Sequence, residues 1–349
     1  MTTNIDNLFR RAIEEKASDL LLSSGSPPVL RIDGELQVQA GEVLSGERIQ
    51  NMVYPLLTDE QIKKLESTCE LDVAIQFDEN HRLRGNVFYT IRGMGTNFRL
   101  LINTIPSLDQ LHLPKLLEQI ALERQGLVLI TGPTGHGKST TLASMIDVIN
   151  TRRRAHIVTI EDPVEFLHEN KLSVVDQREV GLNTRGFSNA LRHVLRQSPD
   201  VILIGEMRDF ETVAAALTAA ETGHLVLSTL HTNDAAQTMD RLVDVFPAHQ
   251  QPQIRTQLAM CVLAVMSQRL LPKEGGGRVV ATELLRRTSA VSTLIREGHT
   301  HQMQTIIETQ GRLGMHTMDS SIKRLLDEGL ISAETAMDHI SDPRRLGTI

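Results

Sequence analysis

At 349 residues the chain is long enough for two domains, and its 40% apolar and 23% charged residues are typical of a folded globular protein. Its net charge of −7 and its 3% aromatic content disfavour a nucleic-acid partner, which would need clustered Lys and Arg and stacking rings. The N-terminus has no apolar signal core. The apolar stretch Ala259–Met266 has eight residues, where a membrane-spanning helix needs roughly 20. We therefore expect a cytoplasmic chain without membrane insertion, and two reduced cysteines without a zinc site.

Residues 1–104 are predicted to form a small α+β domain without a catalytic motif. Apolar residues at helical spacing between Ile5 and Ile13 indicate an opening helix. Asp33-Gly34 is a hairpin signal. The stretches expected to be strands are Asp19–Leu22, Val29–Ile32, Val73–Phe77, Leu83–Ile91 and Asn97–Ile102.

A linker is expected at residues 105–114, because Pro106 favours extended backbone before it. From 115 to 349, short apolar strands alternate with helices, which is typical of a parallel sheet covered on both faces. The tail from about residue 288 is predicted to be helical, with a stop at Gly329 and a new helix capped by Ser332. The predicted strands are Gly126–Thr131, His156–Glu161, Val201–Gly205 and Leu225–Thr229.

A phosphate-binding loop is the strongest motif in the chain. The run from Gly132 to Ser139 matches GxxxxGK[ST] in full, after an apolar strand and before a helix. In such a loop backbone N–H groups surround phosphate, Lys138 neutralises its oxygens and Ser139 binds Mg²⁺. His136 replaces a small residue often found there and is expected to be an inconsequential loop tip. The residues expected to bind ATP are Gly132, Pro133, Thr134, Gly135, His136, Gly137, Lys138, Ser139 and Thr140.

Two further strands end in acidic residues. Glu206 follows Val201–Gly205 as a Walker B carboxylate would, at the sheet edge where α/β proteins place ligands. The segment Thr159–Phe166 ends another strand with three carboxylates, which are either solvated loop residues or groups that position the attacking water. His231 is equally open to a structural or a catalytic role. It cannot share a metal with His224 if the strand between them is extended.

Together these residues resemble the secretion and pilus ATPase superfamily. Leu195–Asp209 is similar to its signature, Thr159–Phe166 to its Asp box and Thr222–Thr232 to its His box. The chain is most similar to the PilT-like type IV pilus retraction ATPases, because its N-terminal module is short and a tetracysteine site is absent. Ala290–Glu297 also resembles their AIRNLIRE motif, with Ser-Thr in place of Arg-Asn.

This resemblance implies a RecA-like P-loop ATPase domain, preceded by a smaller PAS-like α+β domain, in a homohexamer that binds ATP and Mg²⁺ between subunits. Glu165 would be the general base, and Glu206 would bind Mg²⁺ with Ser139. Arginines of the N-terminal module, with Arg84, Arg92 and Arg99 as candidates, would reach the phosphates. One departure is Gln125, where relatives often carry Arg.

The implied function is a motor that retracts type IV pili for twitching motility. Its partners would be the inner-membrane pilus platform protein and related motor rings, at the inner-membrane base of the machine. A PilU-type accessory ring, acting mainly by binding a partner motor, is the alternative. A nucleic-acid translocase is disfavoured by the acidic charge.

Overall fold

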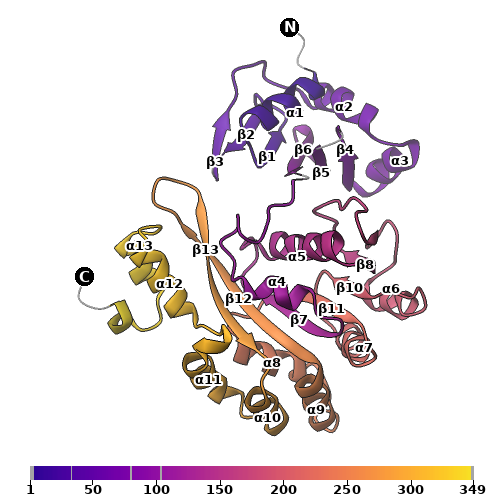
Figure 1. Ribbon diagram of the computed structural model, residues 1–349. Coiled ribbons are helices and arrows are strands. Elements are labelled where there is room, and N and C mark those ends of the chain that lie inside the picture. The colour runs from indigo at the N-terminus through magenta and orange to yellow at the C-terminus, as the bar shows by residue number, and fades with distance from the viewer. Residues whose placement is uncertain (1–3, 33, 79–80, 103, 347–349) are drawn as a thin grey trace. The chain divides into compact units, whose positions relative to one another are not determined.

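The computed structural model describes residues 4–32, 34–78, 81–102 and 104–346, with the backbone alone at 101 and 102. The chain divides into two compact units, Met1–Thr104 and Ile105–Ile349 (Figure 1). Each unit has a hydrophobic core built from its own residues.

The described part of the first unit is an antiparallel six-stranded sheet with three α-helices, and its strand order is β3-β2-β1-β6-β5-β4. Phe9 lies at the centre of its core, edge-on to the rings of Phe98 and Phe77 at 5.1 and 5.4 Å. Its elements are α1 (Ile5–Glu14), β1 (Asp19–Leu22), β2 (Val29–Ile32), β3 (Glu35–Val38), α2 (Gly46–Val53), a 3-10 turn (Tyr54–Leu56), α3 (Asp59–Thr68), β4 (Glu70–Gln76), β5 (His81–Thr90) and β6 (Gly93–Ile102).

The second unit contains a seven-stranded sheet in the order β13-β12-β7-β11-β10-β8-β9, parallel except at β13. Its strands are β7 (Gly126–Thr131), β8 (His156–Glu161), β9 (Val174–Glu179), β10 (Val201–Ile204), β11 (Leu225–Leu230), β12 (Val262–Pro272) and β13 (Arg278–Arg286). Its helices are α4 (Leu116–Ala121), α5 (Lys138–Arg152), α6 (Phe187–Val194), α7 (Phe210–Glu221), α8 (Ala235–Asp244), α9 (Gln251–Cys261), α10 (Ser289–Glu297), α11 (Met303–Thr309), α12 (Met318–Asp327) and α13 (Ala333–His339), with 3-10 turns at Thr300–Gln302, Gly311–Leu313 and Pro343–Leu346.

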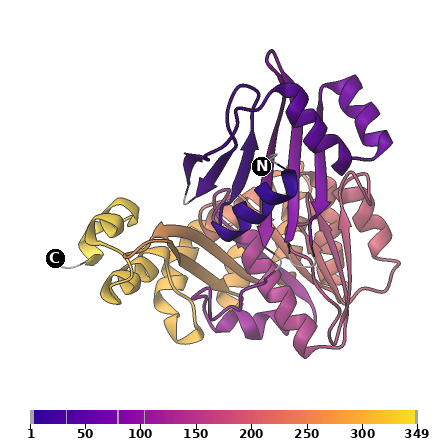
Figure 2. The same cartoon turned by 90° about the horizontal axis from the view of Figure 1, so that it is seen from above.

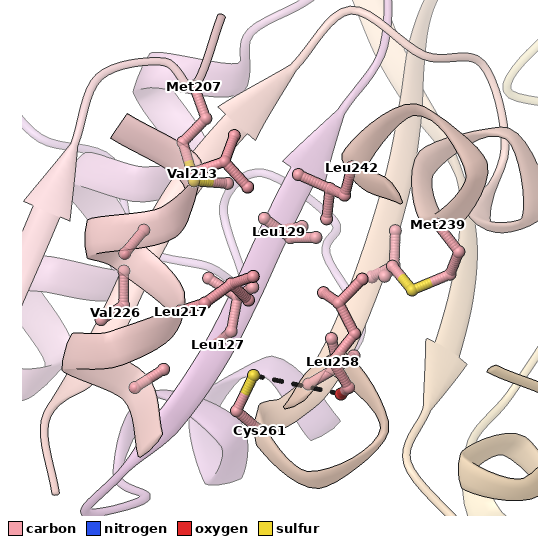
Figure 3. Close-up of a cluster of buried hydrophobic side chains, with 14 of the residues drawn as sticks. Leu127, Leu129, Met207, Val213, Leu217, Val226, Met239, Leu242, Leu258 and Cys261 are labelled. Carbon is pink, nitrogen blue, oxygen red and sulfur yellow. Dashed lines mark hydrogen bonds between the residues drawn. The ribbon is translucent and has the colours of Figure 1, made fainter. Parts of the chain in front are cut away.

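Helices cover both faces of this sheet, as its uniformly apolar strands predict. Leu127 and Leu129 of β7 point into a core formed with α6–α11 (Figure 3). Val128 and Ile130 point the other way, into a core with α4 and α5. Burial of each such side chain contributes about 1.5–3 kcal/mol to folding, so β7 is held firmly between two helical layers.

The hairpin of β12 and β13 extends beyond the parallel strands to the C-terminal helices (Figure 2). Its turn contains Gly275, Gly276 and Gly277, all with positive φ, a conformation that favours glycine. Leu271 and Ala281 of the hairpin pack with Ile322 of α12 in a fourth core. The last helices are therefore anchored on the hairpin.

Most predicted elements are confirmed, with two errors in the sheet. The four predicted strands of the second unit are β7, β8, β10 and β11, and Ser332 caps α13 as predicted. The sheet is not wholly parallel, because β12 and β13 form an antiparallel pair that was missed, as was β9. The apolar run 259–266 hides the junction of α9 and β12, since no polar residue separates them. Asp33 of the predicted hairpin turn lies outside the described residues, although β2 and β3 pair on either side of it.

Candidate nucleotide-binding site

The candidate site lies at the carboxyl edge of the parallel strands. Thr131, the last residue of β7, pairs in register with Leu230 of β11. Ile204, the last residue of β10, is level with Ser228 of β11 and Ile160 of β8. The segments that follow these strands therefore emerge at one edge. They carry the P-loop, His231, Glu206 and the acidic segment after β8.

The P-loop holds its lysine in a largely buried position. Lys138 opens α5, and only 8% of its surface is exposed. Its Nζ donates to the carbonyl oxygens of Gly132 (2.7 Å) and Pro133 (2.9 Å). Burial lowers the pKa of Lys138, and the Glu206 and Glu165 carboxylates act against this shift. The buried ammonium group of Lys138 and the backbone N–H groups at the N-terminus of α5 are the kinds of donor that a phosphate requires. These residues therefore fit a nucleotide's phosphate chain.

Glu206 and His231 stand beside this lysine. The Nδ1 atom of His231 is 3.5 Å from Lys138 Nζ, and its Nε2 atom is 3.4 Å from a Glu206 carboxylate oxygen. The same Glu206 oxygen forms an ion pair with Nε of Arg208 at 2.6 Å. The structure thus brings together three of the predicted residues. The Glu206 carboxylate and the Ser139 hydroxyl are oxygen groups of the kind that Mg²⁺ prefers.

The acidic segment after β8 is built around Glu161, which the sequence placed only in a general acidic cluster. Its carboxyl accepts hydrogen bonds from the Thr159 hydroxyl (2.6 Å), the Gln177 amide (3.2 Å) and the backbone N–H of Glu165. Burial raises the pKa of Glu161 to about 7. Glu165 itself is exposed. Glu161 and Gln177 therefore shape the segment, while Glu165 is the carboxylate that can reach water and Lys138.

The three candidate arginines, all in the first unit, do not form one cluster. Arg84 and Arg99 are cross-strand partners on β5 and β6, whereas Arg92 lies in the turn that joins these strands. Arg99 donates to the buried carboxylate of Asp19 at 3.0 Å. Within the described residues, the guanidinium groups of Arg84 and Arg92 are exposed and make no ion pair. Arg99 is thus committed to its own sheet, and the other two are available to a ligand.

The expectation that His136 is inconsequential is wrong. Its Nδ1 atom accepts a hydrogen bond from the backbone N–H of Leu270 (2.9 Å), and its carbonyl oxygen accepts one from Gln268 (2.6 Å). Sequence reasoning also missed Gln268, because a glutamine in an apolar strand some 130 residues from the loop carries no local motif. Only the structure shows that Gln268 is buried and lies on β12.

Comparison with known proteins shows the family to which the chain belongs. The profile of the type II/IV secretion system proteins matches residues 2–319. The chain belongs to this family. It is 45% identical over 340 residues to the type IV pilus retraction ATPase PilT of Pseudomonas aeruginosa, covering 97% of this chain and 99% of PilT. It is 37% identical to the type IV pilus ATPase PilU of the same organism, over 96% of this chain and 88% of PilU.

A crystal structure of the pilus retraction motor PilT with bound ADP superposes on the chain with a TM-score of 0.92, at 43% identity and 99% coverage of both chains. This likeness confirms the expected fold, a RecA-like ATPase domain with a smaller PAS-like domain. It also supports nucleotide binding by this family member. Among the described residues, no helix is both long and apolar enough to span a bilayer. The described part of the chain contains no group of three or more His, Cys, Asp or Glu side chains arranged for a metal ion.

Replacing the two carboxylates by amides separates their roles. Glu165→Gln should bind MgATP nearly normally and lose about 10²–10⁴-fold in turnover, because an amide cannot deprotonate water. Glu206→Gln should weaken the Mg²⁺ dependence of binding as well as turnover, since one charged ligand is lost. Steady-state ATPase and fluorescent-nucleotide binding measure both effects, with exposed Glu211→Gln as the control. If Glu206→Gln turned over slowly and Glu165→Gln did not, Glu206 would be the general base and Glu165 the Mg²⁺ ligand.

Glu161, half-buried at the end of β8, should make stability depend on pH. Its folded pKa of about 7 lies above the ordinary value of roughly 4.3. The protonated form is therefore favoured by folding, and this stability is lost as pH rises through 7. Glu161→Gln keeps an oxygen acceptor for Thr159 and Gln177, and it should raise stability by about 1–3 kcal/mol at pH 8 but not at pH 4.5. Urea unfolding at both values, with Glu169→Gln as the exposed control, measures this. Equal shifts at both pH values would contradict the assignment.

Proposed function

We propose that the chain is the subunit of an ATP-hydrolysing motor that retracts type IV pili and so supports twitching motility. The observation that carries the proposal is similarity to PilT over nearly the full length of both chains. The geometry supports it, because Lys138, Glu206 and His231 converge at the sheet edge where a phosphate chain would lie. The lower identity to PilU favours a primary motor over an accessory ring.

In the proposed mechanism ATP binds with its phosphates on the P-loop residues 132–140. Lys138 exchanges its backbone carbonyl partners for phosphate oxygens. Ser139 and Glu206 would hold Mg²⁺, which would offset charge on the phosphates. Glu165 orients and deprotonates the attacking water. His231, which lies between Lys138 and Glu206, is placed to sense the terminal phosphate. For Glu206 to bind a metal, its contact with Arg208 must loosen.

We place the motor in the cytoplasm as a homohexamer at the inner-membrane base of the pilus machine, where it would engage the platform protein and related motor rings. In this assembly the nucleotide lies between subunits, and Arg84 or Arg92 of a neighbour approaches the phosphates. The support is that both side chains are exposed and lack an ion pair among the described residues. Arg99 is the weakest candidate, because Asp19 already holds it.

The function is tested in a strain that lacks both PilT-type and PilU-type motors. The chain should restore twitching and shorten the long, immobile pili of that strain. Lys138→Ala should restore neither and should lose ATPase activity while it remains folded, because loss of one phosphate-stabilising charge costs several kcal/mol in the transition state. Lys63→Ala on the exposed face of α3 is the matched control. Restoration only alongside a second motor would assign the chain to the accessory class.

Completion of the site by a neighbour is tested by mixing two inactive proteins. One carries Lys138→Ala, and the other carries Arg84→Ala with Arg92→Ala, leaving Arg99 in place to protect Asp19. In a mixed ring, the intact P-loop of the second protein can meet the intact arginines of the first. Recovery of ATPase supports the proposal, since an arginine supplied in trans contributes about 10³–10⁵ in rate. No recovery at any ratio, with subunit exchange demonstrated by fluorescence transfer, would contradict it.

A further inference from the structure

The loop that carries Lys138 is attached to a strand far away in the sequence. β7 pairs with β12 only as far as Thr131 and Ser267. Beyond that point no strand among the described residues covers this side of β12, and the P-loop lies there instead. The approach is close, because a Cβ atom added to Gly132 would lie 2.3 Å from the backbone oxygen of Gln268. Glycine is required at this contact.

Gln268 connects two parts of the nucleotide site. Its side chain is 98% buried and donates from Nε2 to the carbonyl oxygen of His136 at 2.6 Å. Its Oε1 atom accepts from the Thr141 hydroxyl, in the first turn of α5, at 2.9 Å. One amide therefore fixes the loop relative to the helix whose N-terminus would face the phosphates. Since both amide atoms are used, removal of the side chain leaves buried polar groups without partners.

His136 makes the second attachment. On the side of β7 the pairing within the described residues ends at Ser267, and the Leu270 N–H donates instead to His136 Nδ1 at 2.9 Å. The ring can accept only while Nδ1 is unprotonated, so the contact requires neutral histidine. Serine or alanine at this position would not reach the strand.

We infer that His136 and Gln268 are positioning residues that hold the P-loop in the shape that receives nucleotide phosphates. This inference rests on the proposed nucleotide site. Neither side chain needs to touch the nucleotide, because each acts through the backbone of the loop. Loss of either contact should therefore weaken ATP binding more than it slows the chemical step.

The His136 contact also implies a direction of pH dependence. Burial lowers the pKa of this imidazole, and the nearby cations Lys138, Arg278 and Arg269 lower it further, with a smaller effect from His339 of α13. The ring is thus neutral near pH 7, and the hydrogen bond is lost as pH falls below the ordinary histidine range of about 6.5. KM for ATP should rise as the medium becomes acidic.

The test compares two substitutions of His136 in the full-length protein. His136→Leu removes the acceptor, and we expect KM for ATP to rise about tenfold at pH 7.5, which corresponds to the roughly 1.4 kcal/mol of one orphaned buried N–H. His136→Asn returns an acceptor at the position of Nδ1 and should stay within about threefold of wild type. His249→Leu, an exposed site, is the control. The KM of the wild-type protein should rise as the pH falls from about 8 to about 5.5. His136→Asn should not show this rise, because asparagine does not titrate.

Thr141→Val tests the Gln268 contact without removing Gln268, since valine keeps the shape of threonine and loses its hydroxyl. It should raise KM about threefold to tenfold, as expected for one hydrogen bond. Equal KM values for the Leu and Asn variants of His136, or an unchanged pH profile in His136→Asn, would overturn the inference. Calorimetric titration with MgADP separates this from the proposed function. Wild-type protein that binds no nucleotide overturns the site itself, whereas normal binding in every variant overturns only the positioning role.

Discussion

Four parallel strands of the second unit end level with one another, and the candidate site exists because of this register. β7, β11, β10 and β8 pair without a slip up to their carboxyl ends. The P-loop, His231, Glu206 and the acidic segment belong to separate stretches of sequence, and they meet only because each follows one of these strands. A shift of one residue in any pair would turn the apolar side chains to the opposite face and disrupt both cores. The register is therefore set by burial on two faces.

The sheet also determines the shape of the P-loop through β12. Gln268 and Leu270 hold the loop on one side of this strand, while Leu271 and the partner strand β13 pack against α12 on the other. The nucleotide loop and the C-terminal helices therefore share one hairpin. A displacement of the hairpin would shift both the P-loop and the C-terminal helices, since packed interiors transmit strain.

In the first unit, one buried carboxylate limits which arginines can act elsewhere. Asp19 is 2% exposed, and it accepts from Arg99 and from the Ser18 hydroxyl, with Arg31 at 3.7 Å. A buried charge left without partners costs far more than the net gain of its ion pair. Arg99 is therefore one of the groups that stabilise this buried carboxylate. Arg84, opposite Arg99 on β5, makes no ion pair among the described residues.

The sequence alone determined the P-loop motif, the acidic residue Glu206 at the end of an apolar strand, the principal strands and the Ser332 cap. These features depend on short, contiguous patterns: glycines and a lysine at fixed spacing, apolar runs that end in an acid, and a Ser before a helix. Only the tertiary structure decided the roles of His136, Gln268 and Glu161. Their significance comes from burial and from partners distant in the chain, which no local spacing records. The same reason explains the missed β12–β13 hairpin, because a strand that continues directly from a helix through apolar residues is recognised only by the strand it pairs with.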